Sequence, residues 1–70
     1  MLPLAMAPMG EAQIVKKISG NAETKRHLED LGFTVGGEVS IVSTLAGNLI
    51  VKVKESRIAV SNELARKIMV

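Results

Sequence analysis

The sequence predicts a mainly β protein: a small barrel of five short strands, with one α-helix after the first strand and a short C-terminal helical turn. Three observations support this fold class. Apolar and polar residues alternate with a period of two in several short segments, tight turns separate the later segments, and one stretch alone has helical spacing. We expect residues 1–70 to form a single domain, because a chain of 70 residues buries only one small core.

An apolar arm and a first strand open the chain. Residues 1–10 contain two prolines and end at a glycine, so they favour neither a helix nor a long strand. The arm has more apolar residues than its length requires, and we expect it either to close the bottom of the barrel or to dock on a partner. In the stretch EAQIVKKI, residues 11–18, alternation predicts a strand in which Ile14 and Ile18 point inward and Val15 points outward.

The one long helix is expected to follow a break at residues 19–21 and to end near Leu31. Asn21 is a favourable N-cap, and Glu23 lies in the first turn, where a negative charge suits the helix dipole. Thr24, Leu28 and Leu31 are spaced four and three residues apart, which predicts a narrow apolar stripe on one face.

The glycine-rich stretch after this helix is predicted to be structural. Gly32 follows the C-terminal end of the helix, whereas phosphate-binding loops precede the N-terminal end. Gly32 therefore suits a left-handed helix stop, and Phe33 would pack back on Leu28 as in a Schellman motif. In TVGG, Gly36 occupies the position of a type II turn that requires a positive φ.

The second half of the chain predicts a strand meander. Strands are expected from about residue 38, at 49–54 and at 57–60, with a turn at 45–48 and a tight connection at 55–56. Their inward-facing side chains are expected to be Val39, Ile41, Leu49, Val51, Val53, Ile58 and Val60. Ser61 would then cap a helical turn over residues 62–67, and residues 68–70 would form a last short strand.

Composition excludes several classes of protein. There is no cysteine, so a disulfide framework and a cysteine-ligated metal site are both ruled out. The net charge is only +2, with both signs interspersed, so no acidic or basic tail is indicated. No stretch approaches the roughly 18 apolar residues of a membrane-spanning helix.

The stretch LEDLGFTVGGEVSIV resembles the L-G-[FLM]-x-x-G segment of the ferrous iron transport protein A (FeoA) family. The likeness continues in ESRIAV and ARKI and covers nearly the whole chain. It implies a five-stranded SH3-like barrel and a cytosolic accessory of the ferrous iron permease FeoB, a GTPase-coupled membrane protein. Two positions depart from the family pattern: Val35 replaces a proline, and Glu55 replaces a glycine and would be strained if its backbone were left-handed.

No catalytic motif is present, so we expect a protein that is not an enzyme. Metal binding is a weaker alternative. Glu23, His27 and Asp30 share one helix face and could ligate a divalent ion such as Fe(II). With no ligand from a second element they would form only an open, weak site, so a solvated polar face is the favoured interpretation. We therefore expect no resident cofactor.

Four residues are candidates for partner binding. Val42 and Ile50 point outward and would be neighbours across a hairpin, and Lys52 and Lys54 lie on the same face with Arg57. The resemblance makes the cytoplasmic GTPase part of FeoB the expected partner and the cytoplasm, at the inner face of the membrane, the expected location. The alternatives are a metal-binding SH3-like domain related to iron-dependent repressors and a small-barrel nucleic-acid-binding protein. The latter is disfavoured by the single aromatic residue, because bases stack on exposed aromatic side chains.

Overall fold

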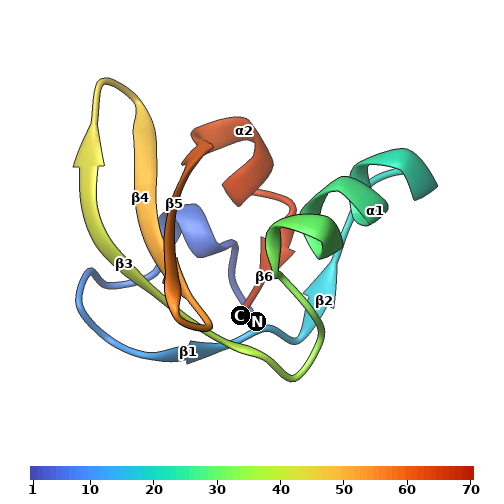
Figure 1. Cartoon of the computed structure of the whole chain (residues 1–70), viewed down its shortest axis with the longest axis horizontal. Helices are drawn as coiled ribbons and strands as arrows, with labels where there is room; N and C mark the ends of the chain where they lie inside the picture. The colour runs from blue at the N-terminus through green and yellow to red at the C-terminus, as the bar shows by residue number, and fades with distance from the viewer.

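A computed structural model describes all 70 residues. The chain folds into six short strands, two α-helices and one turn of 3-10 helix (Figure 1). The elements are, in order, the 3-10 helix Leu4–Met6, β1 Gln13–Ile14, β2 Lys17–Ile18, α1 Ala22–Leu31, β3 Glu38–Leu45, β4 Asn48–Val53, β5 Ser56–Ser61, α2 Asn62–Ala65 and β6 Ile68–Met69.

The strands form two antiparallel sheets. One has four strands in the order β1-β3-β4-β5, and the other pairs β2 with β6. Figure 1 shows the two sheets facing each other, with α1 beside the smaller one and α2 above the gap between them. The mainly β fold is confirmed, although the chain has six strands instead of five and the two sheets are not joined into a closed barrel.

The predicted first strand is wrong in one respect: residues 11–18 form two strands in different sheets. Val15 donates its N–H to the carbonyl of Gly37, next to β3 of the larger sheet, at 2.9 Å. The next N–H, of Lys16, donates to the carbonyl of Met69 in the smaller sheet at 2.7 Å. The chain turns a corner between these residues, so the alternation breaks. As a result Val15 is buried and Ile14 is 50% exposed, the reverse of the predicted orientation, while Ile18 is buried as expected.

The N-terminal arm closes one end of the molecule. Leu2 exchanges backbone hydrogen bonds with Val70 at 2.9 and 2.8 Å, and Pro3 bridges to Met69, so the arm extends the β2–β6 sheet. Leu4 is completely buried, whereas Met1, Met6 and Met9 remain exposed. The arm is therefore part of the fold through its backbone, through Leu4, and through Ala5 and Ala7, which pack against the core.

Helix α1 begins and ends as predicted. The Asn21 side chain accepts a hydrogen bond from the Thr24 N–H at 2.8 Å. At the other end, Gly32 has a left-handed backbone with φ of 111°, and Phe33 donates its N–H to the Leu28 carbonyl at 3.0 Å, as in a Schellman motif. The following turn also forms: Gly37 donates to the Thr34 carbonyl at 2.9 Å, and Gly36 has φ of 88°. Gly32, Phe33 and Gly36 thus have the structural roles that the sequence predicted.

The meander differs from prediction mainly at its turns. Strand β3 runs to Leu45, and the turn consists of Ala46 and Gly47 alone, both with positive φ. In the second hairpin the left-handed residue is Lys54, with φ of 57°, and not Glu55. The positive φ therefore falls one residue earlier than the sequence predicted.

The C-terminal elements are slightly shorter than expected. Ser61 caps α2 by accepting a hydrogen bond from the Leu64 N–H at 3.2 Å, but the helix ends at Ala65 instead of residue 67. The last strand ends at Met69, and Val70 pairs with the arm instead.

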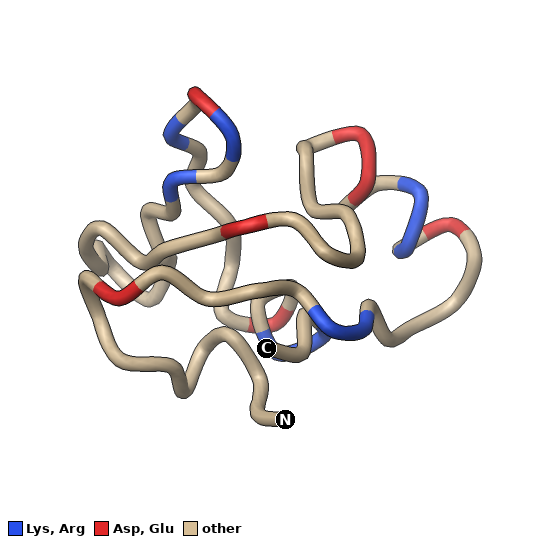
Figure 2. The backbone as a smooth tube through the Cα atoms, turned by 90° about the horizontal axis from the view of Figure 1, so that it is seen from below, with Lys and Arg blue, Asp and Glu red and all other residues tan.

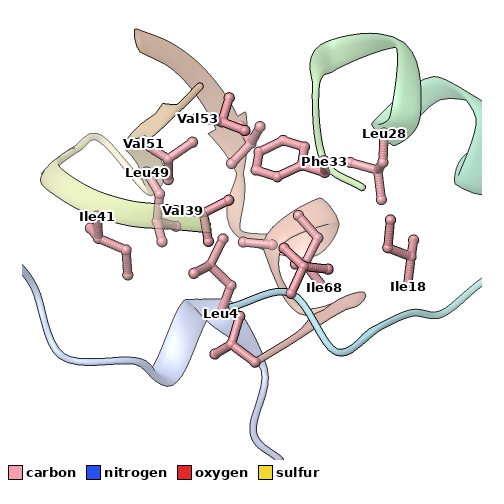
Figure 3. Close-up of a cluster of buried hydrophobic side chains, with 14 residues drawn as sticks. Leu4, Ile18, Leu28, Phe33, Val39, Ile41, Leu49, Val51, Val53 and Ile68 are labelled. Carbon is pink, nitrogen blue, oxygen red and sulfur yellow. The ribbon is translucent and has the colours of Figure 1, made fainter. Parts of the chain in front are cut away.

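The core is a single cluster of 14 buried side chains, all of them apolar (Figure 3). It lies between the two sheets, with Phe33 reaching in from the end of α1. Its members are Leu4, Val15, Ile18, Leu28, Phe33, Val39, Ile41, Leu49, Val51, Val53, Val60, Ala65, Ile68 and Val70. All the predicted inward residues of the meander belong to it except Ile58, which is half-buried and packs against it.

Candidate interaction surface

The face of the β3-β4-β5 sheet that points away from the core contains the predicted partner-binding residues. Strand pairing groups its side chains into rows, because residues opposite one another share a face. Ser40, Lys52 and Arg57 form one row, and Ser43, Ile50 and Ala59 form the next. The structure therefore brings Ile50 and Lys52 onto the same outer face, as the sequence predicted.

One part of this face is basic. Lys52 and Lys54 line a hollow of about 260 Å³ together with Glu38, Val39 and Ser40. Lys52 also lies directly opposite Arg57 in the β4–β5 ladder. Two like charges in opposing positions destabilise a strand pair, so this arrangement favours an acidic binding partner. Figure 2 shows that charged residues gather at a few places along the backbone, with long uncharged stretches between them.

The other part of the outer face is apolar. Val42 is 37% exposed, Leu45 is 68% exposed and Ile50 is half-buried. A β-bulge between Ile41 and Ser43 makes Ser43 the paired partner of Ile50 and leaves Val42 as the extra residue beside that pair. Sequence reasoning missed Leu45 because it assigned this residue to a turn, and the alternation ending at residue 44 gave no sign that the strand continues.

The weak metal candidates lie elsewhere, on α1. Glu23 and His27 line a second hollow, of about 360 Å³, with Asn21, Thr24 and Leu64 of α2. Asp30 is not part of this hollow. No group of three or more His, Asp or Glu side chains comes together at a spacing that suits a metal ion.

The structure has no helix with the length and apolar character needed to cross a bilayer. None of its buried residues is polar or charged, so every ionisable side chain lies at the surface or partly exposed. The outer sheet face therefore offers binding contacts, from lysine and arginine side chains that lie beside apolar ones.

Comparison with known proteins gives consistent results over the full chain. The FeoA domain model matches residues 2–70. A candidate Fe(2+) transport protein A of Methanocaldococcus jannaschii is 39% identical over 70 residues, which is all of this chain and 85% of that protein.

Solved structures share the fold as well. The crystal structure of an iron uptake regulatory protein, FeoA, has a TM-score of 0.88 at 27% identity, over 96% of this chain and 89% of that one. The FeoA protein of Stenotrophomonas maltophilia, described as an SH3 domain protein and solved in complex with zinc, has a TM-score of 0.80 at 26% identity, over 94% of this chain and 85% of its own.

Proposed function

The chain belongs to the FeoA domain family, and from this premise we propose that it is a non-catalytic accessory protein of ferrous iron transport that binds and regulates the permease FeoB. The observation that carries the proposal is the match over residues 2–70, together with a relative named for Fe(2+) transport. The site of action is the cytoplasm, at the inner face of the membrane, where the GTPase part of the permease is exposed.

The surface chemistry supports a protein-binding role. The outer face of the larger sheet combines exposed apolar side chains with Lys52, Lys54 and Arg57. Apolar contacts supply affinity in protein interfaces, and charges around them steer the encounter and select the partner. The hollow of about 260 Å³ on this mixed surface has one apolar lining residue, Val39, so the surface suits a protein partner better than a small molecule, whose sites are larger and mostly apolar.

Titration calorimetry tests the proposal directly. The purified protein is titrated into the cytoplasmic domain of the ferrous iron permease from the same organism, with GDP and then with a non-hydrolysable GTP analogue. We expect saturable binding in at least one nucleotide state, with a dissociation constant in the micromolar range. This corresponds to a binding free energy of about −8 kcal/mol. An absence of heat in both states, with a folded protein, would refute the proposal. Tight binding to nucleic acid in a gel-shift at physiological salt would favour the small-barrel alternative instead.

Metal binding by α1 stays a prediction. The structure brings Glu23 and His27 into one hollow but offers them no third ligand from another His, Asp or Glu. With two protein ligands we expect at most weak binding, because a divalent transition metal is normally held by three or four. Titration with Mn²⁺ or Zn²⁺, followed by NMR, measures this. An imidazole signal of His27 that moves at micromolar metal would contradict this expectation, whereas an unchanged signal would remove the site.

A further inference from the structure

Strand β5 is a long sheet edge that the fold leaves open. The part of β3 beyond Val39 is another, but there the Gly10 N–H donates to the Ile41 carbonyl. The opposite edge of the larger sheet is β1, which has only two residues. In the smaller sheet each strand has two residues, and the arm continues the pairing through Leu2 and Val70. In contrast, β5 has six residues and pairs on one side alone, with β4. Figure 1 shows β5 at the border of its sheet.

Hairpin geometry determines which backbone groups face this open edge. The β4–β5 hairpin has a two-residue turn, so Val53 and Ser56 form the hydrogen-bonded pair next to it. Hydrogen-bonded and non-bonded pairs then alternate along the ladder. The N–H and C=O groups of Arg57 and Ala59 therefore point away from β4, and no backbone hydrogen bond outside the sheet uses them.

Strand β5 has little of the usual protection of an edge. Natural edge strands are kept from pairing by proline, by a bulge, by charged side chains or by a charge that points inward. The sequence SRIAVS has no proline, its register with β4 is continuous, and its one charge, Arg57, lies in an outer row. The row of core-facing side chains Ile41, Val51 and Ile58 is also not fully covered at the edge. Ile41 is 4% and Val51 is 0% exposed, but Ile58 on β5 is only half-buried.

The charge at this edge indicates the chemistry of its occupant. Arg57 lies opposite Lys52, and Lys54 and Glu55 form the turn between their strands. Three cations and one carboxylate are therefore grouped beside the open backbone, and cations predominate. A second copy of this chain is a poorer fit, because β5 contains no acidic residue to oppose Arg57 in a β5–β5 pair. A strand with carboxylates is the better match.

We infer that β5 binds an extended acidic segment of the partner protein by strand addition, with its carboxylates beside Arg57 and Lys52 and its alternate apolar side chains covering Ile58. This inference rests on the proposed function. It adds the contact through which binding occurs, which is a strand of the permease's cytoplasmic part. Backbone hydrogen bonds to Arg57 and Ala59 supply affinity, and the cations select an acidic sequence.

The test compares two proline variants in the calorimetric titration with the permease's cytoplasmic domain. Ala59→Pro removes an N–H that faces the open edge without removing a bond to β4, and edge strands tolerate proline at such positions. Val35→Pro is the matched control, because Val35 is 67% exposed and occupies the turn position that proline favours. We expect Ala59→Pro to weaken binding at least tenfold and Val35→Pro to change it less than twofold. Arg57→Glu should weaken binding at least tenfold at low salt.

A second measurement covers the case in which Ala59→Pro fails to fold, as judged by circular dichroism. Amide hydrogen exchange of the wild-type protein should slow at Arg57 and Ala59 in the complex by tenfold or more, while Met6 and Val35 stay unchanged. If the wild type binds but neither the variant nor the exchange changes, the strand-addition site is wrong and the proposed function stands. If the wild type does not bind, both fall. Sedimentation that shows a dimer lost in Ala59→Pro would overturn the inference in favour of a second copy.

Discussion

The meander of residues 38–61 and the N-terminal segment of residues 1–18 differ in how far along the chain their hydrogen-bond partners lie. In the meander each strand pairs with the next one across a two-residue turn. In the N-terminal segment Leu2 pairs with Val70, Lys16 with Met69 and Val15 with Gly37. Alternation predicted the inward residues of the meander correctly, and it failed at Ile14 and Val15. Local pairing keeps the alternation regular, whereas a segment that changes partners changes the direction of its side chains.

The largest expected effect comes from a charge placed at Val15, immediately before the corner, and Ile14 provides the comparison. Val15→Lys buries an ammonium group in an apolar cluster, at a cost of several kcal/mol. That approaches the whole stability of a small domain, about 5 kcal/mol, so we expect this variant to be unfolded. Ile14→Lys should cost about 1 kcal/mol or less, because half of this side chain is already in water.

Urea denaturation followed by circular dichroism measures both variants. A folded Val15→Lys protein beside an unfolded Ile14→Lys protein would restore the simple alternation over residues 11–18. It would also remove the contrast between the two regions.

The arm is expected to contribute to the core as fully as the meander does. Leu4 is completely buried, so Leu4→Ala should destabilise the protein by about 2–5 kcal/mol through lost burial and a remaining cavity. Met6 lies two residues further and is 73% exposed, so Met6→Ala should change stability by about 0.5 kcal/mol or less. The free energies of unfolding in urea provide the comparison. Equal, small effects would mean that the arm is detached in solution.

These contrasts also define how much of the fold the sequence could predict. The helix caps at Asn21 and Gly32, the turn at Gly36 and the strand faces of the meander all depend on residues close in sequence, and all were predicted. The split of the first strand depends on Met69 and Gly37, which no local pattern reveals. For the arm, the sequence predicted either closure of the barrel or docking on a partner, and its pairing with the distant Val70 shows that it closes one end.

The candidate interaction surface was predictable in part, for the same reason. Alternation placed Ile50, Lys52 and Arg57 on one outer face, and strand pairing confirms that placement. The bulge at Val42 was not visible, because it depends on how β3 aligns with β4. The open edge of β5 was also beyond local reasoning, since an edge is defined by the whole topology and not by its own residues.

The smallest effect concerns the turn between β4 and β5, where the sequence analysis considered a positive φ at Glu55. Lys54, and not Glu55, has a positive φ, and a non-glycine residue pays about 1–2 kcal/mol for that conformation. Lys54→Gly removes this strain but loosens the unfolded chain, so a net gain of about 0.5–1 kcal/mol is expected. That corresponds to a rise in Tm of about 2–8 °C for a domain of this size. Glu55→Gly relieves no strain and should lower stability by about 0.5–1 kcal/mol, because glycine adds only flexibility. Thermal melts of the two variants decide the position: if Glu55→Gly is the more stable of the pair, the left-handed residue lies at 55, and the tight turn follows the family's glycine pattern after all.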